Sequence, residues 1–476
     1  MKPLRLSRRE LLRAAVAAGL ATGGLRARAA PSEEASGGAQ RAEGERSQSD
    51  WVPGEPLPWR NWSGLERCVP ARRLGPASEA ELCAALRGAA GVVRPAGAGH
   101  SFSALVPTSD TLLFLDGLAG VRGVDPSALT AEVWAGTRLG LLGPELQSRG
   151  QAMPNLPDID QQTLGGALAT STHGTGARLG SIASTARALA LATPGGELLE
   201  CDAQRNAEVF RAAATSLGAL GVVTRATLQN RAPFRVVERS RFVPLDDLLA
   251  NIEFARNAAP HFEFYAFPHA DVALEITTVE SDEVLESGPP DDPEALSLLR
   301  TLFRVTRALP GGGRLYSAFL ARQPATARAG WSHEVLAHSR TVRFNEMEYT
   351  VPATRGPDCL RAVLETIRAR DLDVCFPIEC RYVRADDVWL SMFYLRDGFS
   401  ISIHQFAELD WRPYFGAIEP VFWAHDGRPH WGKLHSLDAA RLAELYPRFA
   451  DFQRVRRDLD PERRMANAYL SQILGP

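Results

Sequence analysis

Residues 94–103 read RPAGAGHSFS, a run of small residues after a proline that ends in an imidazole and two hydroxyls. Gly97 and Gly99 can take a positive φ at little cost, so this backbone can approach a bound group closely. Such a turn presents backbone N–H groups that suit an anion such as a pyrophosphate. The spacing is not the G-x-G-x-x-G of ordinary dinucleotide-binding folds, and no helix-opening pattern follows directly. Taken alone, the stretch indicates either a phosphate-binding loop or a tight turn whose histidine, His100, is hydrogen-bonded in a pocket wall.

A second run of glycine, alanine and small hydroxyl residues lies further along the chain. Residues 164–176 read LGGALATSTHGTG and contain His173. Long ligand pockets are lined by convergent polar groups, so two such runs predict two loops that close on one extended ligand. In this order, the two runs resemble the FAD-binding domain of the vanillyl-alcohol oxidase and p-cresol methylhydroxylase (PCMH) superfamily.

The resemblance implies that FAD is the cofactor and that both runs bind it through backbone N–H groups and hydroxyls. The implied FAD contacts are Pro95, Ala96, Gly97, Ala98, Gly99, His100 and Ser101 in the first run, Gly165, Gly166, Ser171, Thr172, His173, Gly174 and Gly176 in the second, and Gly221 and Val222 at the adenine end. For His173 we expect a structural or cofactor contact, with a catalytic base as the alternative.

His100 carries a more specific expectation. In the family, the equivalent histidine often forms a covalent bond to the 8α-methyl group of the flavin. An imidazole held by a fixed loop is a competent nucleophile for that carbon. We therefore expect FAD linked through His100, with a non-covalent contact as the alternative.

The C-terminal region contains a third motif, RPHWGK at residues 428–433. It narrows the resemblance to the sugar-1,4-lactone oxidase group, which includes aldonolactone oxidases and dehydrogenases and the bacterial alditol oxidases. In that group the lysine of His-Trp-Gly-Lys reaches the flavin site, and a Glu-x-Arg comes from a strand of the substrate domain. The matching residues here are Lys433, Glu379 and Arg381, and we interpret His430 as a spacer in the motif.

The three matching residues fit the chemistry of alcohol oxidation. A hydroxyl proton must leave while hydride moves to flavin N5, and positive charge near the flavin pyrimidine assists this step. Lys433 and Arg381 can supply that charge, and Glu379 can accept or orient the substrate hydroxyl. On the residues alone, the alternative is a buried ion network that holds two domains together.

His404 is the candidate substrate-binding residue. It lies in residues 399–406, whose alternation predicts a strand with a solvated or ligand-facing side. There it could hydrogen-bond a sugar hydroxyl. Alditol-oxidising relatives have a small hydroxyl residue two positions after such a histidine, where this chain has Phe406, and this difference leaves the polyol contact open.

The resemblance implies an FAD-dependent oxidoreductase that oxidises a CH–OH group of an aldono-1,4-lactone, such as L-gulono- or D-arabinono-1,4-lactone. Oxygen or another acceptor would reoxidise the flavin. The alternatives are an alditol oxidase of the xylitol or sorbitol type, an oxidase of another alcohol or amine, and an exported flavin-binding protein without turnover.

The pattern of elements predicts an α+β protein of two domains. The expected parts are a PCMH-type FAD-binding domain at 59–234, a substrate (cap) domain built on an antiparallel sheet with flanking helices at 235–425, and a C-terminal segment at 426–476 that returns to the flavin site. Helices are expected at 78–89, 139–149 and 202–214, and strands at 91–94, 111–115, 130–134, 222–228, 272–277, 388–395 and 399–406. The acidic, proline-rich stretch 281–293 predicts a surface loop or a break in order.

The N-terminus predicts export. Residues 7–12 read SRRELL, an alanine-rich apolar stretch follows, and residues 27–29 give a small-x-small cleavage site. We expect a twin-arginine signal peptide at 1–30, a disordered linker at 31–58, and a periplasmic or extracellular mature protein delivered by the twin-arginine export machinery. The apolar stretch is too short and interrupted for a stable membrane span. The alternative is a chance basic N-terminus on a cytoplasmic protein.

Composition excludes several other classes. A net charge of −3 and a pI near 6.4 argue against a nucleic-acid partner. The six cysteines include no C-x-x-C pair, so neither zinc nor a disulfide scaffold is expected. Cys375 and Cys380 could oxidise, or could be small buried hydrophobes. The histidines are too dispersed in sequence to predict a metal site.

Overall fold

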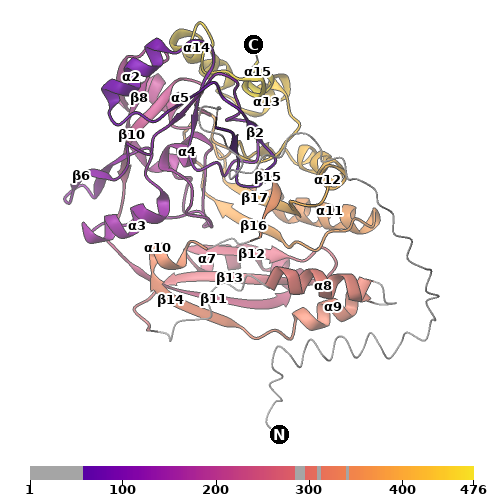
Figure 1. Ribbon diagram of the computed structural model, residues 1–476. Helices are drawn as coiled ribbons and strands as arrows, with labels where there is room; N and C mark the ends of the chain where they lie inside the picture. Colours follow the sequence, from indigo (N-terminus) through magenta and orange to yellow (C-terminus); the bar gives the residue numbers. More distant parts are fainter. Residues whose placement is uncertain (1–56, 285–294, 308–311, 339–341, 476) are drawn as a thin grey trace, which may run out of the picture.

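Two sheets dominate the N-terminal part of the chain (Figure 1). The computed structural model describes residues 57–284, 295–307, 312–338 and 342–475. A three-stranded parallel sheet has the order β3-β5-β4, and a five-stranded antiparallel sheet has the order β6-β7-β10-β8-β9. Their strands are β3 (Arg72–Leu74), β4 (Val93–Ala96), β5 (Thr111–Phe114), β6 (Val121–Asp125), β7 (Thr130–Trp134), β8 (Ala186–Ala192), β9 (Leu198–Asp202) and β10 (Val222–Gln229).

The helices predicted at 78–89 and 139–149 are confirmed as α2 (Glu79–Gly88) and α3 (Leu139–Ser148). At the start of α2, the Ser78 hydroxyl accepts the Glu81 N–H at 3.2 Å, and the Glu81 carboxylate accepts the Ala77 N–H at 2.9 Å. Two otherwise unpaired N–H groups are thereby satisfied at the helix terminus.

The second half of the chain forms an eight-stranded antiparallel sheet with the order β14-β11-β13-β12-β16-β17-β15-β18. Its strands are β11 (Arg235–Pro244), β12 (His261–Ala266), β13 (Val272–Glu280), β14 (Thr326–Trp331), β15 (Phe344–Pro352), β16 (Ile378–Val383), β17 (Gly398–Phe406) and β18 (Arg428–Pro429). Flanking helices are α6 (Leu245–Ala250), α7 (Ile252–Ala258), α8 (Ala295–Arg307), α9 (Gly312–Leu320), α10 (Ser332–Val335), α11 (Gly356–Ala369) and α12 (Arg412–Ala424). The predicted α+β class, with a cap built on an antiparallel sheet and flanking helices, is confirmed.

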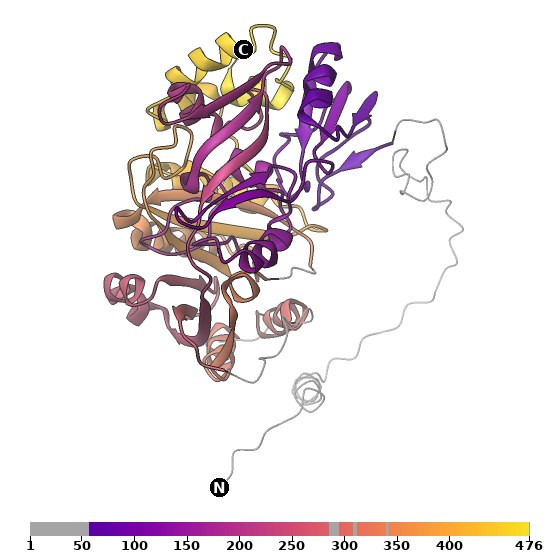
Figure 2. The ribbon, with the colours of Figure 1, turned by 90° about the vertical axis from the view of Figure 1, so that its left-hand side faces the viewer.

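The last three helices lie against the N-terminal part of the molecule rather than beside the cap sheet (Figures 1 and 2). They are α13 (Ala439–Leu445), α14 (Phe449–Leu459) and α15 (Ala468–Leu474). The Val93 N–H donates to the Arg464 carbonyl at 2.8 Å, and the Arg454 guanidinium pairs with Glu208 at 2.8 Å. Both ends of the described chain thus help to build the same half of the protein. The predicted boundaries after residues 234 and 425 stay predictions.

The strand predicted at 388–395 is wrong. Residues 388–395 form turns between β16 and β17, and Leu395 has a φ of 55°. The Asp386 side chain holds this segment in turns, because it accepts hydrogen bonds from the Val388 N–H at 3.2 Å and the Ser391 hydroxyl at 2.7 Å. The apolar residues that mimicked a strand pattern are buried in these turns instead: Val388, Trp389, Leu390, Met392 and Phe393.

Two further expectations need correction. The second glycine-rich run is not a loop throughout, since its first residues form α4 (Leu164–Ala169), which Thr163 caps by accepting the Gly166 N–H at 3.3 Å. The helix predicted at 202–214 is shorter, α5 (Ala207–Ala213). Asp202 stops it from starting earlier, because its carboxylate accepts the N–H groups of residues 204 and 205 at 2.8 Å each and holds them in a turn.

Other sequence predictions fall outside the described residues. These are the signal peptide at 1–30, nearly all of the linker at 31–58 and most of the loop at 281–293. Among the described helices, none is long and apolar enough to cross a membrane. Cys375 and Cys380 are buried free thiols, as the second of their two interpretations predicts.

Candidate functional site

A cavity of about 500 Å³ is lined by both glycine-rich runs, by strands of the cap sheet and by the C-terminal motif. The predicted site residues that line it are Pro95, Ala96, Gly97, Ala98, Gly99, His100, Ser101, Gly165, Gly166, Thr172, His173, Gly221, Val222, Glu379, Arg381, His404 and Lys433. Segments far apart in the sequence therefore meet at one cavity.

The first run is held rigidly at the cavity wall. The Trp62 N–H donates to the Gly99 carbonyl and the Phe102 N–H to the Gly432 carbonyl, both at 2.7 Å. The His100 ring stacks on Trp62 with 5.6 Å between ring centroids. Burial, with a smaller contribution from the nearby Lys433 ammonium, lowers the pKa of His100 to about 4. At neutral pH this imidazole is therefore uncharged, as a nucleophile must be.

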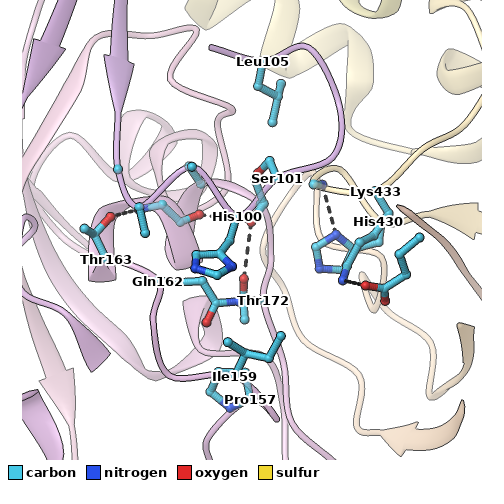
Figure 3. Close-up of a pocket in the computed structure, with 18 of the residues that line it drawn as sticks. His100, Ser101, Leu105, Pro157, Ile159, Gln162, Thr163, Thr172, His430 and Lys433 are labelled. Carbon is cyan, nitrogen blue, oxygen red and sulfur yellow. Dashed lines mark hydrogen bonds and ion pairs between the residues drawn. The ribbon is translucent and has the colours of Figure 1, made fainter. Parts of the chain in front are cut away.

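The second run contributes both lining and support. Figure 3 shows Thr172 and His100, one from each run, with Lys433 and His430 of the C-terminal motif. Ser171, Gly174 and Gly176 do not line the cavity. Ser171 is buried and donates to the Ser391 hydroxyl at 3.2 Å, and a Cβ on Gly174 would come within 2.1 Å of the Leu156 carbonyl oxygen. These residues shape the run behind the lining rather than face the cavity.

The backbone around the cavity fits an elongated cofactor with a pyrophosphate. A Cβ on Gly97 would lie 2.3 Å from the Thr163 hydroxyl oxygen. Gly221 has a φ of 134°, and a Cβ there would lie 2.3 Å from the Ala192 carbonyl oxygen. Glycine is required at both positions, which leaves bare backbone against the cavity, as close approach to a phosphate demands. These features fit the FAD that the sequence predicts.

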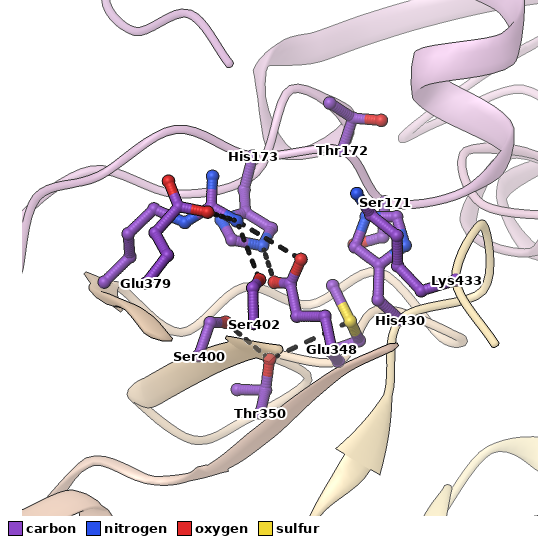
Figure 4. A network of polar contacts seen from close by, with 12 residues as sticks. Ser171, Thr172, His173, Glu348, Thr350, Glu379, Ser400, Ser402, His430 and Lys433 are labelled. Carbon is purple, nitrogen blue, oxygen red and sulfur yellow. Dashed lines mark hydrogen bonds and ion pairs between the residues drawn. The ribbon is translucent and has the colours of Figure 1, made fainter. Parts of the chain in front are cut away.

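A buried polar network crosses the cavity wall (Figure 4). His173 Nε2 lies 2.6 Å from Glu348 Oε1, and the other Glu348 oxygen accepts from Arg381 at 3.2 Å. Arg381 also pairs with Glu379 at 3.5 Å, and the Tyr265 hydroxyl donates to Glu379 at 3.0 Å. The network thus joins the second glycine-rich run to strands β12, β15 and β16 of the cap sheet.

The charges in this network stabilise one another. Burial opposes ionisation of Glu348, but His173 and Arg381 hold the pKa of this carboxyl well below its usual range. Burial likewise opposes the charge of Arg381, and the surrounding carboxylates raise its pKa, Glu379 most strongly. Glu379 and Arg381 thus form a buried ion network and also line the cavity, so the network and the predicted site share these two residues.

Lys433 forms the other charged contact at the cavity. Its ammonium pairs with one oxygen of Glu346 and lies 5.0 Å from the centroid of the Phe102 ring. The second Glu346 oxygen lies 3.6 Å from His404 Nε2. Glu346 therefore sets the position of the lysine and the predicted substrate-binding histidine together.

The sequence predictions missed several cavity residues: Glu263, Tyr265, Glu346, Glu348 and His430. The sequence did indicate two of them, Glu346 and Glu348. Both lie in β15, a buried strand that reads FNEMEYTVP. A buried glutamate needs a partner, so two in one strand indicate a polar site. His430 is more than a spacer, because it lines the cavity and its Nδ1 accepts the Gly432 N–H at 3.0 Å, which fixes the turn before Lys433.

The fold also brings together side chains that could hold a metal. The two groups are His173, Glu348 and His430, and Glu346, Glu379 and His404, each with ligand atoms within 4.8 Å of one another. The carboxylates of both groups already pair with Arg381 or Lys433.

Both halves of the chain match known families. Residues 70–202 match an FAD-binding domain, and residues 226–473 match the D-arabinono-1,4-lactone oxidase family. FAD is the cofactor of the matching N-terminal domain, in agreement with the glycine geometry of the cavity.

Similar proteins extend over nearly the whole chain. An L-gulono-1,4-lactone dehydrogenase of Mycobacterium tuberculosis is 37% identical over 88% of this chain and 99% of its own. An alditol oxidase of a Streptomyces species is 31% identical over 87% and 98%. A solved cholesterol oxidase from Brevibacterium sterolicum has a TM-score of 0.71 at 16% identity, covering 88% of this chain and 96% of its own, and thus shares the fold. The chain belongs to the D-arabinono-1,4-lactone oxidase family and is an FAD-dependent oxidoreductase.

Proposed function

We propose that the protein oxidises a CH–OH group of an aldono-1,4-lactone, with oxygen or another acceptor taking the electrons afterwards. The observation that carries the proposal is the convergence of Glu379, Arg381 and Lys433 on the cavity that both glycine-rich runs line. The relative named for L-gulono-1,4-lactone and the matching family named for D-arabinono-1,4-lactone support the substrate class.

Bound FAD supplies the hydride acceptor. The side chains of this protein orient the substrate and stabilise the charge that develops on it. The Glu379 carboxylate, oriented by the Tyr265 hydroxyl, accepts the hydrogen bond of the reacting hydroxyl. Arg381 and Lys433 place fixed positive charge at the cavity, where it favours the developing negative charge without reorganisation.

Phe406 favours a lactone over an alditol. The resemblance implies a small hydroxyl residue at this position in the alditol-oxidising group. Here the ring does not line the cavity and is buried against Phe376, which does, with 4.5 Å between ring centroids. The Arg300 guanidinium lies over the same ring, 4.3 Å from its centroid. No hydroxyl is available from this position for a further contact to an open polyol chain.

Anaerobic flavin reduction tests the proposed function. We expect L-gulono- and D-arabinono-1,4-lactone to bleach the flavin of the purified holoprotein, and xylitol and sorbitol to do so much more slowly. Admission of air then measures reoxidation, which is rapid for an oxidase and slow for a dehydrogenase. Bleaching by the polyols alone would overturn the substrate class, and a flavin that no lactone or polyol bleaches would indicate a binding protein without turnover.

We also propose that residues 1–30 form a twin-arginine signal peptide, followed by a linker at 31–58, and that the mature protein is periplasmic or extracellular. The basis is the arginine pair Arg8 and Arg9 before an apolar stretch and a small-x-small site at 27–29. Replacing both arginines with lysine should leave the protein inside the cell, as measured by fractionation and immunoblot. Arg13→Lys, a change in the same segment outside the pair, is the matched control. Equal export of the double variant and the control would contradict the proposal.

A further inference from the structure

Glu263 is a buried carboxyl group in the cavity wall that differs from its acidic neighbours. It lies on β12 opposite Arg381 of β16 and Ile276 of β13, and its residue is only 8% exposed. Glu346, Glu348 and Glu379 each pair with a cation. Within the described part of the chain, Glu263 has neither an ion pair nor a side-chain hydrogen bond.

A buried carboxyl without such a partner is more stable with its proton. Burial is the main cause that raises the pKa of Glu263 to about 8, and the charge of Glu379 adds to it. The charged and titratable groups that face Glu263 are Glu379 and Arg381 from β16, Asp158 from the loop before α4, His338 after α10, and, across a small adjoining cavity, Glu238 of β11 and His261 of its own strand. Near neutral pH, Glu263 is therefore a carboxylic acid with an O–H to donate.

Three other donors of this wall already bond carboxylates. The Tyr265 hydroxyl donates to Glu379, the Arg381 guanidinium to Glu348, and the Lys433 ammonium pairs with Glu346. Their partners are carboxylates that can accept hydrogen bonds from substrate hydroxyls. A lactone also has a carbonyl oxygen, which carries no hydrogen and can only accept. The acid of Glu263 is complementary to that oxygen.

We propose that Glu263, as a carboxylic acid, donates a hydrogen bond to the carbonyl oxygen of the lactone and so makes the site select lactones over alcohols of the same shape without a carbonyl. This inference rests on the proposed function. It makes Glu263 a specificity-determining residue, whereas Glu379, Arg381 and Lys433 belong to the reaction itself.

The test compares two ligands that differ by one oxygen, L-gulono-1,4-lactone and the corresponding 1,4-anhydroalditol. The flavin of the holoprotein is first reduced with dithionite, so that neither ligand reacts, and the dissociation constants are measured by calorimetry at about pH 6. We expect wild type to bind the lactone about tenfold more tightly, as one good hydrogen bond allows. Glu263→Gln keeps an N–H donor and should keep most of this preference. Glu263→Leu should lose it.

Glu275→Gln is the matched control, since it changes a glutamate of the neighbouring strand β13 that pairs with Arg241 and does not line the cavity. It should keep the wild-type preference. A folded, FAD-loaded Glu263→Leu protein that retains the wild-type preference overturns the proposal. Failure of every lactone to bleach wild type would instead overturn the proposed function, so the two failures are distinct.

The protonation state of Glu263 has a separate test, which needs no ligand and does not depend on the folding of the Glu263→Leu variant. Because the pKa of Glu263 is raised by folding, its proton stabilises the folded state at low pH, and this contribution is lost as pH rises toward about 8. Glu263→Gln does not titrate. Its melting temperature relative to wild type should therefore rise steadily between pH 5 and pH 8. A constant difference over that range means that Glu263 is not the proton donor proposed.

Discussion

Replacing His100 with alanine should abolish the covalent bond between the protein and its flavin. After precipitation in acid, the wild-type pellet should stay yellow, and the His100→Ala pellet should be colourless with free FAD in the supernatant. The reason is that burial and the Lys433 ammonium hold the pKa of His100 to about 4, so its ring nitrogen is available as a nucleophile at neutral pH. The rigid loop and the stacked Trp62 ring fix its direction.

His425→Ala is the control for this prediction, because this histidine lies at the end of α12 and bonds the Val421 carbonyl away from the cavity. It should keep the colour of its pellet. Under native conditions, His100→Ala should still bind FAD reversibly, because the bare backbone at Gly97 and Gly221 is unchanged. A wild-type pellet that loses its colour in acid would refute the covalent bond and leave His100 as a non-covalent contact.

Local sequence predicted most of the residues on the glycine-rich side of the cavity, although Ser171, Gly174 and Gly176 lie behind the lining. The glycines and His100 act through backbone conformation and short-range geometry, which a run of ten residues already encodes. The same is true of the cap at Ser78, where two hydrogen bonds close within a few residues.

The substrate side depends on strand register, which local sequence does not encode. Glu346 meets His404 because β15 pairs with β17 in one register, and Glu263 lies opposite Arg381 because β12 pairs with β16. A shift of one residue would turn each of these side chains to the other face of the sheet. The wrong strand at 388–395 has a related cause, since burial of a tight turn gave the same apolar pattern as a strand.

Replacing Lys433 with methionine should slow flavin reduction by the lactone by about 10²–10³-fold, as loss of one preorganised charge at a reacting centre does elsewhere. The ammonium is held toward the cavity by Glu346 and by the face of the Phe102 ring, so no free energy is spent on reorienting it during the reaction. Methionine has a similar length without the charge. The rate constant is measured by anaerobic stopped-flow bleaching at saturating lactone, and the FAD content of the variant should equal that of wild type.

Lys433→Met also leaves Glu346 buried without its cation, which should cost up to about 3 kcal/mol of folding free energy. Adding Glu346→Gln removes the unpaired carboxylate and separates the two effects. The double variant should recover most of the melting temperature lost by Lys433→Met, but its flavin should still be reduced slowly. A double variant with a wild-type reduction rate would show that Lys433 has only a structural role. Slow reduction together with restored stability identifies the lysine charge as part of the reaction.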